Sequence, residues 1–154
     1  MPTDIDQRLD ALGITLPEAP APAASYVPFV ISGNLVFISG QISRDEGGPI
    51  TGKLGDGMTV AEGQAAARTC AIALLAHLKL ACRGDLDRVA RVVKLTGFVN
   101  ATPDFTDHPA VINGASELIA EVFGERGQHA RAAVGTASLP LGVAVEVEGI
   151  FEIA

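Results

Sequence analysis

The sequence switches between the two-residue period of a β-strand and the 3.6-residue period of a helix, and the order of these switches restricts the fold. Apolar runs at residues 26–31 and 35–38 are typical of strands. Ser32, Gly33 and Asn34 join them with the composition of a tight turn. The first element of the domain is therefore predicted to be a β-hairpin.

Two helices with apolar stripes are predicted after the hairpin and a Gly-rich loop. Thr59 and Glu62 have the spacing of a capping box, which predicts the start of a helix that runs to Cys82. The second helix is predicted to begin near Asp107 and Pro109, before Gly124 ends it. The stripes consist of Ala67, Ala71, Leu74, Leu78 and Ala81 in the first helix, and of Val111, Ala115, Leu118, Ile119, Val122 and Phe123 in the second.

Three further strands complete the pattern, at residues 89–99, 130–138 and 143–153. The order is ββαβαββ, which indicates a single α+β domain with a mixed sheet covered by two helices. A short helix at residues 3–12 and an extended Pro/Ala-rich stretch form a lead segment, residues 1–24. The domain proper is predicted to span residues 25–154.

The composition favours an oligomer and disfavours polyanionic partners. The 154 residues carry a net charge of -7, so neither nucleic acid nor a polyphosphate is expected as a ligand. The chain is 48% hydrophobic but only 5% aromatic, and its mean hydropathy is +0.34. Part of this apolar surface is expected to lie in a subunit interface.

The cysteines and the N-terminal residues indicate a reducing, cytoplasmic location. Cys70 and Cys82 lack neighbouring ligands at metal-site spacing, so we expect core thiols and no metal. The acidic N-terminus has no unbroken apolar core, as a signal peptide would require. No apolar run is long enough to span a membrane.

Charged residues in the last two predicted strands are the candidates for chemistry. Glu146, Glu148 and Glu152 share the strand face opposite an apolar face, and a solvated surface is the favoured interpretation. Arg131 is the single charge in a run of small residues. Its guanidinium requires an anion, which is either an internal acid or a ligand carboxylate. Spacing alone slightly favours the internal ion pair.

At this point the sequence resembles a known family. The stretches YVPFVISGNLVFISGQIS and HARAAVGTASLPLGVAVEVEGI are similar to the two hallmark segments of the RidA/YjgF family, also known as L-PSP endoribonucleases. The most specific feature is an Arg, then a Leu-Pro pair, then alternating Val and Glu. The resemblance runs from about residue 22 to the C-terminus. The HARxAVG form is similar to a divergent branch of the family.

The resemblance implies a chorismate-mutase-like homotrimer with clefts at the subunit boundaries. It implies that Arg131 holds a substrate carboxylate and that Glu146 positions or activates a hydrolytic water. It further implies that Tyr26, Ser39 and Gly40 line the pocket. Asn113 matches a family Asn less closely, because the spacing around it differs.

The implied reaction needs no cofactor. It is the hydrolysis of a reactive 2-imino or enamine acid, of the 2-aminoacrylate type, to a keto acid and ammonia. Many family members have a Cys where this chain has Ala133.

Two other functions remain open at this stage. One is a trimer that binds a small carboxylate metabolite without reaction, and the other is the endoribonuclease of the family's second name. The acidic charge and the absence of Trp argue against RNA cleavage. Glu148 is expected either to pair with Arg131 or to face solvent.

The three histidines receive mainly structural interpretations. His77 is expected to be a packed or surface residue within a helix, and His108 to belong to a helix start. His129 lies close to Arg131 in the sequence and could border the cleft.

Overall fold

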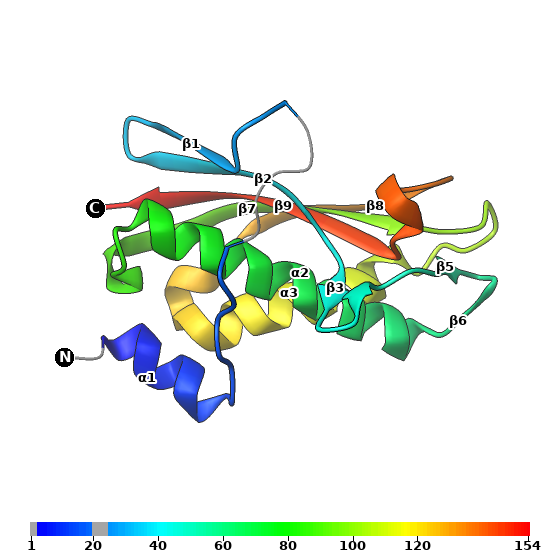
Figure 1. Cartoon of the computed structure of the whole chain (residues 1–154), viewed down its shortest axis with the longest axis horizontal. Helices are drawn as coiled ribbons and strands as arrows, with labels where there is room; N and C mark the ends of the chain where they lie inside the picture. Colours follow the sequence, from blue (N-terminus) through cyan, green and yellow to red (C-terminus); the bar gives the residue numbers. More distant parts are fainter. Residues whose placement is uncertain (1–2, 20–24) are drawn as a thin grey trace.

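The β1–β2 hairpin (Phe29–Ser32 and Leu35–Ile42) continues into a five-stranded sheet, in a computed structural model that describes residues 3–19 and 25–154. The strand order is β1-β2-β9-β7-β8, and two long helices pack on one face of the sheet (Figure 1). The predicted α+β fold is confirmed. The other main elements are α1 (Asp4–Ala11), α2 (Val60–Ala81), β7 (Val89–Asn100), α3 (His108–Phe123), β8 (Ala130–Thr136) and β9 (Val145–Ile153).

The sheet is mixed because one strand pair runs parallel. β7 pairs β8 in parallel, whereas β1–β2, β2–β9 and β9–β7 are antiparallel. The crossover from β7 to β8 is formed by α3, as a parallel pair requires. β8 is therefore an edge strand that lies beside α3, and this placement matters for the site.

The boundaries of several elements differ from the predictions. β2 extends past the predicted end at residue 38, because Gln41 and Ile42 pair β9 after a register shift. β9 begins at Val145, after a short 3-10 turn at Pro140–Gly142. The predicted Gly-rich loop contains four two-residue strands: β3 (Arg44–Asp45), β4 (Gly48–Pro49), β5 (Lys53–Leu54) and β6 (Gly57–Met58).

The helix termini follow the sequence signals closely. Thr59 and Glu62 form the predicted capping box at the start of α2. Thr3 caps α1 in the same way, and the Asp87 carboxylate accepts hydrogen bonds from its first two N–H groups. Residues 20–24 of the predicted extended lead segment lie outside the described residues.

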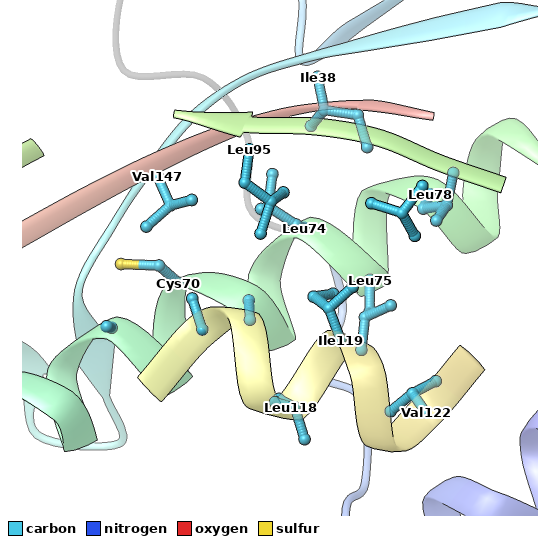
Figure 2. Packing of buried hydrophobic residues seen from close by; sticks show 14 of the residues in the cluster. Ile38, Cys70, Leu74, Leu75, Leu78, Leu95, Leu118, Ile119, Val122 and Val147 are labelled. Atoms are coloured by element: carbon cyan, nitrogen blue, oxygen red, sulfur yellow. The ribbon is translucent and has the colours of Figure 1, made fainter. Parts of the chain in front are cut away.

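The core lies between the helices and one face of the sheet. Figure 2 shows Leu74 and Leu78 of α2 with Leu95 and Val147 of the sheet in one layer, and Leu118 of α3 beneath them. Both predicted apolar stripes are buried. Cys70 and Cys82 are free, buried thiols, as expected. Within the described ranges, no helix is both long and apolar enough to cross a bilayer.

The packing of α2 generates a stability prediction. Leu74 is completely buried, whereas Leu80 on the same helix is 59% exposed. Leu74→Ala removes methyl groups and leaves a cavity, so we expect the free energy of unfolding to fall by about 2–5 kcal/mol. Leu80→Ala serves as the matched control and should change it by less than about 0.5 kcal/mol. Chemical denaturation of both variants measures the difference, and equal losses would contradict the assigned core.

Candidate functional site

Arg131 points from β8 toward α3, on the helix-covered face of the sheet. It pairs with Leu95, a core residue whose side chain lies on that face. Its Nη1 donates to the Asn113 Oδ1 at 2.8 Å and to the Ser116 Oγ at 3.3 Å. Its Nη2 donates to the carbonyl oxygen of Pro109 at 3.5 Å. The N-terminal half of α3 therefore holds the guanidinium from one side.

His129 orients one of these acceptors. Its Nδ1 lies 2.6 Å from the carbonyl oxygen of Gly127, and its Nε2 lies 2.9 Å from the Ser116 Oγ. A carbonyl can only accept, so Nδ1 carries the proton, and in the neutral ring Nε2 accepts the Ser116 hydroxyl proton. A lone pair of Ser116 is then left for Arg131. We call Asn113, Ser116, His129 and Arg131 the Arg131 half-site.

The acceptors around Arg131 are neutral. In residues 3–19 and 25–154, the one ion pair joins Lys79 of α2 and Asp6 of α1, and neither residue belongs to β8 or α3. Asn113, Ser116 and the Pro109 carbonyl orient the guanidinium without neutralising it. The internal ion pair favoured by spacing alone is absent from the described residues. An uncompensated guanidinium has the charge and the N–H geometry that suit a carboxylate.

Glu146 lies on the opposite, open face of the sheet. It pairs with Ile42 of β2 on one side and with Phe98 of β7 on the other, and Phe98 in turn pairs with Val134 of β8. The carboxylate is thus half-buried in an otherwise apolar row. Burial raises the pKa of Glu146 above its ordinary value, and the negative charge of nearby Glu148 raises it further. Such a carboxylate is a stronger proton acceptor than a solvated one.

Ser39 and Gly40 lie at the register shift of β2, beside Glu146. The shift between Ile38 and Gln41 inserts one extra residue opposite β9, as a β-bulge does. A Cβ on Gly40 would overlap the Glu146 carboxylate, so glycine is needed for this close approach. The Ser39 hydroxyl donates to the carbonyl oxygen of Val27 at 2.8 Å. We call Ser39, Gly40 and Glu146 the Glu146 half-site.

Tyr26 belongs to the segment that is tied to this half-site. The Ser39 amide donates to the carbonyl oxygen of Pro28, and its hydroxyl donates to that of Val27. The Tyr26 side chain itself is 49% exposed. The segment is therefore anchored next to Ser39 while its aromatic side chain stays accessible.

One chain does not bring the two half-sites together. Arg131 is level with Gly149 of β9, three residues from Glu146, and the two residues are two strands apart. Each offset amounts to about 10 Å, and the side chains leave opposite faces of the sheet. Glu148 shares the open face with Glu146, so it does not pair with Arg131. A small ligand that contacts both groups would need them to come from different chains.

The sequence reasoning missed Ser116. It lies three residues after Asn113, on the same face of α3 and away from the apolar stripe, so helical spacing could have indicated it. His77 is buried, and its Nδ1 has no hydrogen-bond partner among the residues that the structure describes. Among the described residues, no three His, Cys, Asp or Glu side chains gather as a metal site would require.

Comparisons with known proteins identify relatives that match nearly the whole chain. Protein TCP17 of Trypanosoma cruzi is 55% identical over 148 residues, which are 95% of this chain and 92% of that protein. The 2-iminobutanoate/2-iminopropanoate deaminase of Dermatophagoides farinae is 30% identical over 142 residues, 91% of this chain and 94% of that protein.

Solved structures show the same fold. The crystal structure of protein Atu1372 from Agrobacterium tumefaciens, described as having unknown function, superimposes with a TM-score of 0.90 at 52% identity. The match covers 97% of this chain and 92% of that one. Residues 6–152 match the family model described as "YjgF/chorismate mutase-like, putative endoribonuclease". The chain therefore belongs to the YjgF/chorismate mutase-like family.

Proposed function

We propose that this protein hydrolyses small 2-imino acids in clefts where the Arg131 half-site of one subunit faces the Glu146 half-site of another. The observation that carries the proposal is the Arg131 guanidinium, which three neutral acceptors orient and no described acid neutralises. The named activity of the Dermatophagoides farinae relative supports the same reaction class. The proposed products are a keto acid and ammonia.

Arg131 binds the substrate carboxylate in this proposal. A guanidinium offers two parallel N–H donors to a carboxylate, and such charge-assisted bonds are about twice as strong as neutral ones. Because Asn113 and Ser116 already fix the orientation of the guanidinium, little ordering is left for the binding step. The carboxylate then places the adjacent C=N carbon at a set distance from Arg131.

Glu146 activates the water that attacks this carbon. The carboxylate accepts a proton from the water while the C–O bond forms and the C=N electron pair moves to nitrogen. The carbinolamine nitrogen then gains a proton and leaves as ammonia, while the hydroxyl group loses its proton and becomes the carbonyl. A positioned general base of this kind accelerates a reaction by about 10²- to 10⁴-fold. The half-buried position of Glu146 increases its basicity for this task.

A homotrimer would supply the second chain. The open face of the sheet presents apolar side chains in the single chain: Val30 is 52% exposed, Phe37 is 41% exposed and Val134 is 45% exposed. Val30 and Phe37 pair directly, and Phe37 also pairs with Ile150. An exposed apolar surface of this kind is typical of a subunit interface. It is the surface that also carries Glu146.

The endoribonuclease activity in the family description is a weaker candidate for this chain. Glu146, Glu148 and Glu152 all lie on the open face, and their charges would repel a phosphate backbone. Binding of a carboxylate without turnover would use the same Arg131 half-site. Pyruvate binding and ammonia release by the wild-type protein distinguish this alternative from hydrolysis.

Two single variants and their mixture test the composite cleft. Arg131→Ala and Glu146→Gln should each lower ammonia release from freshly generated 2-iminopropanoate by at least about 10²-fold. Mixed trimers of the two variants, formed by unfolding and refolding, combine an intact Arg131 with an intact Glu146 at one site in four. Ammonia release should therefore recover to about a quarter of the wild-type rate.

Wild-type protein refolded in the same way is the control for this mixing experiment. A mixture that stays inactive while each variant keeps its oligomeric mass would contradict the two-chain cleft. Tight pyruvate binding without any imine turnover by the wild type would instead identify a binding protein.

If the open face is the subunit interface, a charge at its centre should prevent assembly. Phe37→Glu should convert the trimer to monomers, because burying the new carboxylate in the interface would cost several kcal/mol. Glu117→Ala, on the exposed face of α3, is the control and should leave the trimer intact. Analytical ultracentrifugation measures both. A trimeric Phe37→Glu protein would exclude this face as the interface.

The pKa of Glu146 predicts the pH dependence of the reaction. Glu146 must be ionised to accept a proton, so kcat should fall as the pH drops through its raised pKa. Glu148→Gln removes the nearby negative charge and should move this acid limb to lower pH. Glu117→Gln should leave the limb unchanged. Identical pH profiles for the wild type and Glu148→Gln would contradict the proposed base.

A further inference from the structure

An open cavity of about 370 Å³ lies at the ends of β7 and β8, next to the start of α3. Its lining includes Phe105, His108, Gly135 and Thr136. The role proposed above for Arg131 and Glu146 uses none of these side chains. The cavity is large enough for a small organic molecule.

The His108 imidazole is held in place without using its nitrogens. Its ring lies directly over Gly135, where any Cβ would overlap the Nε2. Phe105 contacts the ring edge-on, with centroids 5.5 Å apart. The histidine ring hydrogen bonds in the described part of the chain both belong to His129. Packing thus sets the position of the His108 ring, and its nitrogens are left for another partner.

The cavity and the Arg131 half-site both lie where α3 packs beside β8. His108 lies over Gly135, and Ser116 lies over Arg131, so α3 runs antiparallel to β8 alongside it. The eight-residue rise from 108 to 116 in α3 and the four-residue rise from 131 to 135 in β8 both amount to about 12–13 Å. The two contacts are therefore compatible with one antiparallel packing. Arg131 also reaches the carbonyl oxygen of Pro109, the residue after His108. The Arg131 guanidinium therefore reaches the first turn of α3, the turn that also carries His108.

We propose that His108 is a catalytic residue that protonates the departing amine. The proposal rests on the imine hydrolysis proposed above and assigns a second proton-transfer group to it. Glu146 of one chain accepts a proton from the attacking water. His108 donates a proton to the leaving nitrogen, and it belongs to the other chain, which also supplies Arg131. Addition and elimination then have separate acid-base groups.

Each proton that moves in the proposed reaction has a donor and an acceptor. Water adds to the iminium carbon, its first proton passes to Glu146, and the C=N electron pair moves to nitrogen. Protonated His108 then gives a proton to that nitrogen, and the C–N bond breaks with its electron pair on the amine. The hydroxyl oxygen forms the carbonyl, and its proton returns to His108. Glu146 passes its proton to ammonia, which leaves as ammonium.

The test compares steady-state ammonia release from 2-iminopropanoate in three proteins. His108→Ala should lower kcat by about 10²-fold with KM nearly unchanged, because Arg131 still binds the carboxylate. Added imidazole should restore part of the rate, since the variant leaves a ring-sized space over Gly135. Arg131→Ala should raise KM and show no restoration by imidazole. Thermal unfolding and oligomeric mass check that each variant keeps its fold.

A second variant keeps His108 in the chain. Gly135→Ala places a Cβ where the imidazole lies, so it should displace the ring and lower kcat as well. Full kcat in His108→Ala overturns the proposal, even if Arg131→Ala is inactive and imine hydrolysis itself stands. A His108→Ala loss that imidazole does not restore, combined with full activity in Gly135→Ala, also overturns it. If the wild-type protein does not hydrolyse the imine, both the proposed function and the proposed role of His108 are wrong.

Discussion

The register of β7 with its two neighbours determines where every charge of the site lies. Leu95 pairs with Arg131 on β8, and Phe98 pairs with Glu146 on β9. Phe98 is the third residue after Leu95, and this odd offset makes the two charges leave the sheet on opposite faces. A slip of β8 by one residue would turn Arg131 away from α3 and onto the open face. Gly135 opposes such a slip, because a slipped β8 would place a residue with a side chain beneath the His108 ring, where a Cβ would overlap the imidazole.

The neutral acceptors around Arg131 have a physical consequence for binding. An acid at position 113 would form an ion pair and compete with any ligand carboxylate for the guanidinium. The Asn113 amide oxygen instead orients the same donor at 2.8 Å and leaves its charge available. His129 extends this arrangement, because its bond to Ser116 directs the hydroxyl lone pair toward Arg131. The half-site would thus be ordered before the proposed ligand arrives, which would lower the entropy lost on binding.

The sequence predicted the elements well because their periodicities are strong. The apolar stripe of α2 and the alternation of β9 identified both the elements and their buried faces. The direction of Arg131 could not be predicted in this way, since its strand consists of small residues on both faces. The bulge at Ser39 and Gly40 was equally hidden, because only the register with β9 reveals it. Asn113, the least specific of the transferred site residues, proved to contact Arg131 directly.

The separation of Arg131 and Glu146 within one chain prevents them from neutralising each other. On one face and within 4 Å, they would form an ion pair that occupies the guanidinium and lowers the pKa of the carboxylate. On opposite faces, Arg131 keeps its charge, and Glu146 keeps the raised pKa that its apolar row imposes. In the proposed trimer, a substrate between two subunits would bring together charges that a single chain keeps apart. Assembly would then create the reactive cleft, and neither half-site would be active by itself.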